Sequence, residues 1–322
     1  MNILVTGCAG FIGFHISLKL LKSRINVVGV DNLNKYYDVN LKKNRLKSLK
    51  DFKNFSFYKT DLLHYKKLDK IIKNYKIKFI IHLAAQAGVR YSIKNPKLYF
   101  KSNLEGFFNI LELSKNNQIK HLIFASTSSV YGNSKKFPLQ ENANTDSPLS
   151  FYAATKKSNE IMAHSYSYIY KIPCTAVRFF TVYGSFGRPD MALFKFTKNI
   201  IENKVIELFN NGNHIRDFTY IDDIVDGIYS LIKEQPKNKI PYDTFNIGNG
   251  NPKKLLDYIK QIELHLNKKA KIKKLPLQLG DVVKTHAQIK KIKTKTKYKV
   301  KTNINKGIAN FIEWYQDYYK VN

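Results

Sequence analysis

Short apolar runs alternate with longer helix-like stretches throughout the first half of the chain. The apolar runs are rich in β-branched residues, and strand–helix alternation of this kind implies parallel pairing through right-handed crossovers. The pattern therefore predicts a doubly wound α/β fold with a parallel Rossmann sheet. The predicted strands are residues 2–6, 26–31, 55–60, 78–84, 121–126 and 174–178, and the predicted helices are residues 11–22, 39–49, 65–74, 97–116 and 150–170.

The alternation loosens after residue 178, where Pro, Gly and Asn become frequent. We therefore expect residues 1–178 to form the Rossmann domain and residues 179–322 to form a smaller α/β lobe. Some of the second part, around residues 216–233, is expected to pack back on the first. A ligand cleft is expected between the two parts. Helices are predicted in the second part at residues 190–202, 222–233, 252–267 and 305–319.

A glycine-rich turn joins the first predicted strand to the first predicted helix, with the sequence TGCAGFIG at residues 6–13. Gly7 suits a tight turn, Gly10 allows close approach of a pyrophosphate, and Gly13 lets the helix pack against the sheet. Asp31 follows Gly13 by 18 residues, at the end of the second predicted strand. A carboxylate there accepts hydrogen bonds from a ribose and repels a 2′-phosphate, which favours NAD over NADP. The alternative is an ordinary glycine turn and a solvated Asp.

A tyrosine and a lysine lie four residues apart in the sequence YAATK, at Tyr152 and Lys156. On a helix they share one face, and an ammonium beside a phenol favours the phenolate and lowers its pKa. Such a pair forms a general acid/base suited to a sugar hydroxyl. The alternative is a chance pair in a chain with 21 tyrosines. The glycine turn and the hydroxyl-rich stretch ASTSSVYG at residues 125–132 favour the catalytic interpretation.

A longer stretch, DNLNKYYDVNLKKNRLKSL at residues 31–49, carries the most specific resemblance to a known family. With AAQAGVRYS, SFYAATKKSNE, RFFTVYG, GRPDMA and HIRDFTYIDDI, it makes the chain resemble UDP-glucuronate 4-epimerases over nearly its whole length. These belong to the extended short-chain dehydrogenase/reductases. The chain departs from the family pattern at GSFG, LGDV and THAQI, which bears mainly on the uridine contacts.

The resemblance implies roles for particular residues. It implies that Thr127, Tyr152 and Lys156 are catalytic and that residues 179–322 bind the nucleotide sugar. The implied cofactor contacts are Gly7, Gly10, Phe11, Ile12, Gly13, Asp31, Asn32, Asp61, Leu62, Leu83, Ala84, Ala85, Gln86, Asn103, Tyr152 and Lys156.

Substrate contacts are implied as well. Arg216 is expected at the diphosphate and Asp281 at the uridine ribose, while Thr181 and Arg188 are expected to border the sugar pocket. Arg90 is a candidate for steering the glucuronate carboxylate, because a guanidinium can bind a carboxylate through two hydrogen bonds. An exposed, solvated arginine is the equal alternative for Arg90. With Ser128, these are the six expected substrate contacts.

The stretch after Thr127 separates this chain from two related activities. Sugar-nucleotide dehydratases resembling it carry an acid pair there, and UDP-glucuronate decarboxylases carry a glutamate beside the V-Y-G. Here the positions hold Ser128 and Ser129. Without an acid, elimination lacks its proton carrier, whereas hydroxyls can donate hydrogen bonds to an anionic substituent. The residues therefore favour epimerisation, unless the motif has drifted while its chemistry survived.

Composition bounds the remaining possibilities. The chain has 322 residues, of which 43% are hydrophobic, so an ordered core is expected. Only Cys8 and Cys174 are cysteines, which fits a reducing cytosol and no disulfide framework. We expect no signal peptide and no membrane insertion. The eight histidines show no ligand spacing, so no metal site is expected.

The net charge is +31, from 55 Lys and Arg against 24 Asp and Glu. Attraction to a polyanion is one interpretation. The other is a scattered lysine-rich composition without a partner, and since no single basic tract stands out, we expect no specific nucleic-acid partner. In either case, the positive electrostatic field of the protein attracts an anionic substrate.

Together these features predict an NAD-dependent isomerase that inverts C4 of UDP-glucuronate to give UDP-galacturonate through a 4-keto sugar. The alternatives are a neutral-sugar epimerase, acting on UDP-glucose or an N-acetylhexosamine, and a non-catalytic dinucleotide-sensing or nucleic-acid-binding protein. The resemblance also implies a homodimer, with residues 97–116 and 150–170 as candidate interface helices.

Overall fold

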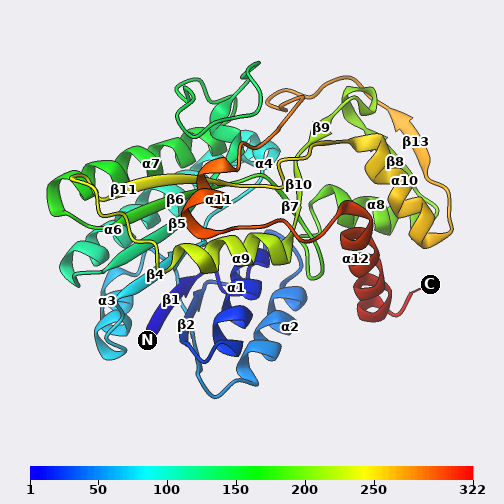
Figure 1. The fold of residues 1–322 in the computed structure, drawn as a ribbon. Helices are drawn as coiled ribbons and strands as arrows, with labels where there is room; N and C mark the ends of the chain where they lie inside the picture. Colours follow the sequence, from blue (N-terminus) through cyan, green and yellow to red (C-terminus); the bar gives the residue numbers. More distant parts are fainter. Residues whose placement is uncertain (322) are drawn as a thin grey trace.

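The computed structural model describes residues 1–321 and centres on a seven-stranded parallel sheet (Figure 1). The strand order is β11-β6-β5-β4-β1-β2-β3, so β1 lies between β4 and β2 and the connections run outward in both directions from it. This is the doubly wound arrangement that the strand–helix alternation predicts. The strands are β1 Asn2–Thr6, β2 Asn26–Asp31, β3 Phe55–Lys59, β4 Phe79–His82, β5 His121–Thr127, β6 Cys174–Phe179 and β11 Tyr242–Ile247.

Helices cover both faces of this sheet, because side chains alternate along each strand. In β1, Ile3 and Val5 join the core beneath one helical layer, whereas Leu4 joins the core beneath the other. The first layer consists of α1 Phe11–Lys22, α2 Val39–Lys50 and α9 Ile221–Leu231. The second layer consists of α3 Tyr65–Asn74, α6 Gly106–Asn116 and α7 Phe151–Tyr170.

Two features of the sheet layer differ from the sequence prediction. Strand β11 comes from beyond residue 178, yet it completes the sheet, whereas helix α9 packs on α1 and lies within the stretch around residues 216–233 that was expected to pack back. The predicted helix at residues 97–116 is also broken. It begins as α5 Pro96–Tyr99, passes through a π-helical segment at Phe100–Glu105 and continues as α6. Such π segments often lie at functional sites.

The smaller lobe packs three helices against short strand pairs beside the carboxyl ends of the main strands (Figure 1). Its core is aromatic, and the rings of Phe218 and Tyr258 stack with centroids 4.0 Å apart. The helices are α8 Ala192–Ile201, α10 Leu255–Leu266 and α12 Ile304–Tyr319. The strand pairs are β7 Thr181–Tyr183 with β10 Phe218–Tyr220, β9 Ile215–Arg216 with β12 Lys253–Lys254, and β8 Val205–Leu208 with β13 Lys271–Lys274. Two further short helices pack on the sheet layer: α4 Val89–Lys94 contacts α7, and α11 Lys290–Thr296 contacts β11 and α9.

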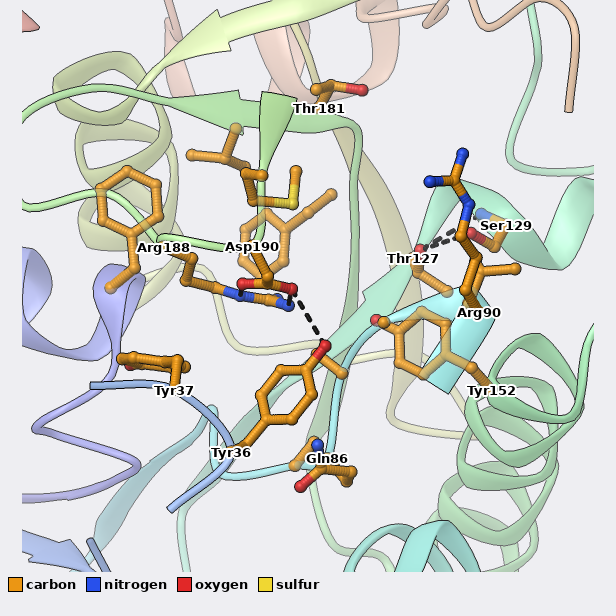
Figure 2. A pocket seen from close by; sticks show the side chains of 18 of the residues that line it. Tyr36, Tyr37, Gln86, Arg90, Thr127, Ser129, Tyr152, Thr181, Arg188 and Asp190 are labelled. Carbon is orange, nitrogen blue, oxygen red and sulfur yellow. Dashed lines mark hydrogen bonds and ion pairs between the residues drawn. The ribbon is translucent and has the colours of Figure 1, made fainter. Parts of the chain in front are cut away.

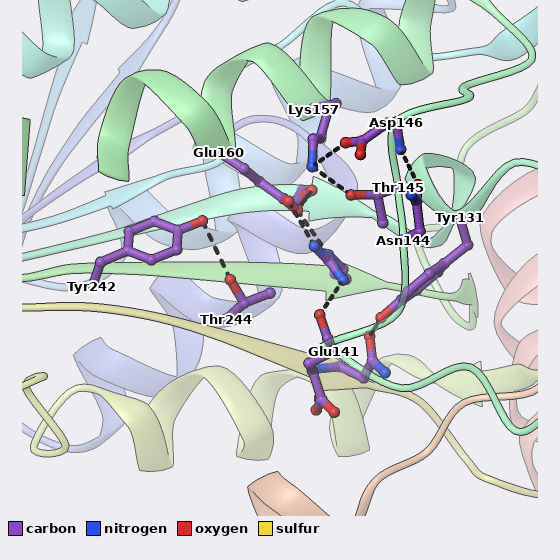
Figure 3. Close-up of polar contacts among 12 residues, drawn as sticks. Tyr131, Glu141, Asn144, Thr145, Asp146, Lys157, Glu160, Tyr242 and Thr244 are labelled. Atoms are coloured by element: carbon purple, nitrogen blue, oxygen red, sulfur yellow. Dashed lines mark hydrogen bonds and ion pairs between the residues drawn. The ribbon is translucent and has the colours of Figure 1, made fainter. Parts of the chain in front are cut away.

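A buried ion pair ties helix α7 to the sheet (Figure 3). Arg178 on β6 donates through Nε and Nη2 to the two carboxylate oxygens of Glu160 on α7, at 2.8 and 2.7 Å. Ser126 on β5 donates to the same carboxylate at 2.5 Å, and Arg178 also donates to the Glu141 carbonyl at 3.0 Å. Glu160 lies one turn beyond Lys156, so this network sets how α7 faces the end of β5.

Within residues 1–321, none of the helices has the length and apolar character needed to cross a membrane.

Candidate active site

A cleft of about 1100 Å³ opens over the carboxyl ends of the central strands. It extends from the glycine turn after β1, past the ends of β4 and β5, to the smaller lobe. The chain reverses its winding direction between β1 and β4, and doubly wound sheets bind ligands at this point. Figure 2 shows the part of the cleft around Tyr152.

The glycine turn is packed so closely that side chains are excluded from it. A Cβ on Gly7, whose φ is +73°, would lie 2.8 Å from the backbone nitrogen of Ala84. A Cβ on Gly13 would lie 2.0 Å from the Gly7 carbonyl oxygen. Helix α1 follows Gly10 without a side-chain cap, so the backbone amides of its first turn remain available to a ligand. This geometry fits the pyrophosphate of a dinucleotide.

Asp31 lies at the end of β2 and lines the cleft. Its carboxylate accepts hydrogen bonds from the backbone nitrogens of Leu33 at 2.8 Å and Ala9 at 3.1 Å. Burial raises the pKa of Asp31, and these two bonds partly counteract the rise. Beside it, Asn32 donates to Asp61 at 2.7 Å. The residues present therefore fit a ribose and the adjoining adenine, as an NAD site requires.

We expect Asp31→Asn to weaken NAD binding about tenfold, because a charged acceptor for the ribose hydroxyls is lost. NADP binding should weaken less or improve, because the repulsion of its 2′-phosphate is removed. Asp38→Asn is the matched control, since Asp38 caps α2 by accepting from Asn40 and does not line the cleft. Calorimetric titration of both dinucleotides would measure the ratio, and an unchanged NAD-to-NADP ratio would contradict the role of Asp31.

Every other predicted cofactor residue also lines the cleft, with one exception. Asn103 lies behind the lining and is almost completely buried. Its side chain accepts from the Gln86 backbone nitrogen at 2.8 Å and donates to the Gln86 carbonyl at 3.0 Å. Asn103 lies in the π-helical segment Phe100–Glu105. In the described structure Asn103 therefore supports the Gln86 backbone, and its role as a direct cofactor contact stays a prediction.

The three predicted catalytic residues converge in the cleft. Tyr152 and Lys156 come from the first turns of α7, and Thr127 ends β5. Lys156 is buried and donates to the Ala125 carbonyl at 3.0 Å, and burial lowers its pKa to about 8. The Thr127 hydroxyl accepts from the Ser129 backbone nitrogen at 3.2 Å. Figure 2 shows the Tyr152 hydroxyl turned toward Thr127.

The electrostatics of Tyr152 differ from the sequence expectation. Burial raises the pKa of its phenol above the ordinary value, and the charge of Arg188 and a hydrogen bond with Thr127 only partly counteract this. Lys156 was expected to lower the pKa, but its ammonium is turned to the Ala125 carbonyl. In the protein without ligand, the free-energy cost of burying a phenolate exceeds the stabilisation that nearby cations provide, so the pKa is raised.

The expected substrate contacts form two groups. Ser128, Thr181 and Arg188 line the cleft near Tyr152, and Arg188 forms an ion pair with Asp190. Tyr36, which neither the motifs nor their spacing had singled out, donates to the same Asp190.

The second group lies at the mouth of the smaller lobe. Arg90 donates to Asp281 at 2.9 Å, and its guanidinium lies over the Phe209 ring at 4.6 Å. Arg216 donates to the Val283 carbonyl at 2.8 Å, and burial lowers its pKa to about 10. Arg90 is thus grouped with the residues expected at the uridine and diphosphate, and its steering of a carboxylate stays a prediction.

Sequence reasoning missed a number of lining residues, among them Tyr36, Asp190 and Phe209. Tyr36 and Asp190 lie inside quoted motifs, DNLNKYYDVN and GRPDMA, which were the available signals. Phe209 has no such signal. Among residues 1–321, no cluster of His, Cys, Asp and Glu is arranged to hold a metal ion.

Comparison with known proteins adds independent support for a common family. The model of the NAD dependent epimerase/dehydratase family matches residues 3–248. Protein CapI of Staphylococcus aureus is 48% identical over 99% of this chain and 100% of its own length. A UDP-glucuronate 4-epimerase of Thermodesulfobacterium geofontis is 44% identical over 97% of this chain and 95% of its own.

A solved structure is also similar. UDP-glucuronic acid 4-epimerase from Bacillus cereus, in complex with UDP-glucuronic acid and NAD, superposes with a TM-score of 0.93 at 34% identity. The similarity covers 99% of this chain and 100% of that one.

Proposed function

The chain belongs to the NAD-dependent epimerase/dehydratase family, and on that premise we propose that it interconverts UDP-glucuronate and UDP-galacturonate. The observation that carries the proposal is the convergence of Thr127, Tyr152 and Lys156 in one cleft, beside a glycine turn that fits a dinucleotide. The relatives and the solved structure support the same substrate class.

Each of the proposed catalytic residues has a separate role in the reaction. The glycine turn and Asp31 would hold NAD, which would supply an acceptor and donor for the C4 hydride. Tyr152 takes the proton of the C4 hydroxyl and later gives it back, which is general base and then general acid catalysis. Thr127 hydrogen-bonds the same oxygen and stabilises its developing charge. Lys156, held by Ala125, contributes a cation close to the phenol.

Inversion requires the 4-keto sugar to rotate and present its opposite face while the nucleotide stays bound. Arg216 and Asp281 line the cleft on the side of the smaller lobe, and we assign them to the diphosphate and the uridine ribose. The serines after Thr127 provide hydroxyls without an acid, so they can hold the C5 carboxylate without promoting elimination. Holding this carboxylate also suppresses decarboxylation of the keto acid. Ser128, Thr181 and Arg90 are the candidates for that task.

The test is to supply NAD-loaded protein with UDP-glucuronate and, separately, with UDP-glucose, and to follow C4 inversion by NMR. Inversion of the uronate supports the proposal, and inversion of UDP-glucose alone would identify a neutral-sugar epimerase. If neither sugar changes while the protein shifts DNA with a steep salt dependence, the non-catalytic alternative is supported instead.

The protein is also proposed to form a homodimer through α6 and α7, which lie side by side in one helical layer. Both helices and the π-helical segment carry exposed apolar side chains, as an interface requires. They are Phe100, Phe108, Ile161, Tyr168 and Ile169.

We expect Ile161→Glu to raise the dimer dissociation constant roughly 100-fold, because it places a charge in an apolar interface and repeats it in the partner. Leu264→Glu is the matched control, since Leu264 is 64% exposed but lies on α10 in the other lobe, against 57% for Ile161. Analytical ultracentrifugation would measure both. A monomeric wild type, or equal effects of the two variants, would contradict this interface.

A reducing compartment such as the cytosol is proposed from the two cysteines. Cys8 and Cys174 are both buried free thiols. Burial raises the pKa of Cys174 to about 12 and that of Cys8 well above its ordinary value, so neither is poised for oxidation.

A further inference from the structure

A chain of polar contacts joins Tyr36 to Arg188 across the cleft (Figure 2). The Tyr36 hydroxyl donates to Oδ2 of Asp190 at 3.0 Å. Arg188 donates to the same carboxylate twice, from Nε to Oδ1 at 3.0 Å and from Nη2 to Oδ2 at 2.6 Å. Tyr36 lies in the loop between β2 and α2, whereas Arg188 and Asp190 precede α8 of the smaller lobe. The contact therefore joins the two parts of the protein.

Tyr36 is held in place from the other side as well. Its ring lies against that of Tyr91, with centroids 4.7 Å apart. Gly88, whose φ is +111°, leaves the space that the Tyr36 hydroxyl occupies, since a Cβ there would lie 2.6 Å from that hydroxyl. Burial and the nearby Asp190 raise the pKa of Tyr36 to about 12. The hydroxyl is thus protonated at neutral pH and remains a donor.

The same segment fixes the loop that carries Arg188. Arg45 on α2 is fully buried. Its Nη2 donates to the carbonyls of Phe186 at 2.6 Å and Gly187 at 3.2 Å, and its Nη1 donates to the carbonyl of Ala9 at 2.8 Å. Residues 31–49 thus hold both the backbone before Arg188 and the carboxylate that orients its guanidinium. This is also the stretch that carries the most specific family resemblance.

The orientation of Arg188 matters because the guanidinium lies close to the chemistry. Its charge lowers the pKa of Tyr152 against the larger effect of burial. Asp190 is itself held below its ordinary pKa by Arg188 and Tyr36, although burial opposes this. The carboxylate therefore stays ionised and neutralises the pair. Because Asp190 largely balances the charge of Arg188, the contribution of Arg188 to ligand binding depends mainly on the direction of its guanidinium hydrogen-bond donors.

We propose that Tyr36 is a positioning residue that acts through Asp190 to fix the Arg188 guanidinium at the sugar end of the cleft, and so strengthens binding of the uronate part of the substrate. A guanidinium already held in one direction binds an oxygen-rich sugar acid without a further ordering cost. The proposal rests on the proposed function for the identity of the ligand.

The test compares two ligands that differ only at the sugar end. Calorimetry on NAD-loaded protein would give the dissociation constants of UDP-glucuronate and of UDP. Tyr36→Phe should weaken UDP-glucuronate about tenfold and change UDP by less than about twofold, because a hydrogen bond to a charged group is lost only at the sugar end. Tyr58→Phe is the control, since Tyr58 pairs with Tyr75 at 2.9 Å and does not line the cleft.

A double-mutant cycle separates positioning from a general structural effect. In an Asp190→Ala background, Tyr36→Phe should cause no further weakening, because its partner is already gone. The proposal is overturned if Tyr36→Phe weakens both ligands equally, weakens neither, or adds its full effect to that of Asp190→Ala. It is also overturned if the wild type binds UDP-glucuronate no better than UDP. C4 inversion by the wild type, measured separately, tests the proposed function itself.

Discussion

Replacing Tyr152 with Phe is expected to lower kcat for C4 inversion by about 10²- to 10⁴-fold, the range for loss of a general acid/base. The substitution removes only the hydroxyl that faces Thr127 and leaves the ring, which packs near Tyr99 with centroids 6.1 Å apart. NAD retention and thermal unfolding should therefore remain close to those of the wild type. NMR progress curves with UDP-glucuronate would measure the loss.

Tyr166→Phe is the matched control for this loss. Tyr166 lies on the same helix α7 and donates to Glu112 at 2.7 Å, outside the cleft. It should retain wild-type kcat. Appreciable turnover by Tyr152→Phe, within about tenfold of wild type, would remove Tyr152 from its assigned role.

Replacing Glu160 with Ala is expected to lower the free energy of unfolding by ~3–5 kcal/mol, because it leaves a buried guanidinium without its counterion. Both side chains of the Arg178–Glu160 pair are only 5% exposed, so water cannot take over the lost contacts. The Ser126 hydroxyl loses its acceptor at the same time. Chemical denaturation at constant protein and NAD concentration would measure the change.

A second variant distinguishes the pair from simple loss of packing. The double substitution Glu160→Met with Arg178→Met removes both charges and should recover much of the stability, as apolar replacement of a buried pair often does. A loss below about 1 kcal/mol for Glu160→Ala would show that Arg178 finds other partners, such as the carbonyl of Glu141 that it already contacts.

Activity should fall together with stability in Glu160→Ala. Glu160 lies one helical turn beyond Lys156 and is joined to Ser126, which precedes Thr127. Loosening this network frees the rotation of α7 relative to β5. The catalytic distance between the phenol and Thr127 depends on that rotation, and small misplacements reduce rates strongly.

Local patterns along the chain were enough to predict much of the fold. Six of the seven main strands and most of the helices between them follow from apolar runs and strand–helix alternation, whereas the predicted helix at residues 97–116 is broken. The glycine turn was also predictable, because the backbone there excludes side chains for reasons within one strand–turn–helix unit. The pairing of Tyr152 with Lys156 follows from helical periodicity.

Other features depended on contacts between distant residues. Strand β11 was not among the strands predicted from the sequence, and it pairs in parallel with β6 at the edge of the sheet. Asn103, in the π-helical segment, accepts a hydrogen bond from the Gln86 backbone nitrogen, and the sequence pattern does not show this contact. Arg90 lies with Asp281, 191 residues away, and this contact places it with the expected uridine residues.

By itself the sequence determined the parallel α/β class, the glycine turn that fits a dinucleotide and the placement of Tyr152 and Lys156 on one helical face, because each depends on spacing within a few tens of residues. Only the tertiary structure decided the pKa of Tyr152, which is raised by burial from many sides. It alone also placed Tyr36 on Asp190, 154 residues away. Burial and long-range hydrogen bonds depend on how the whole chain folds around the cleft, and local sequence patterns do not predict these contacts between distant residues.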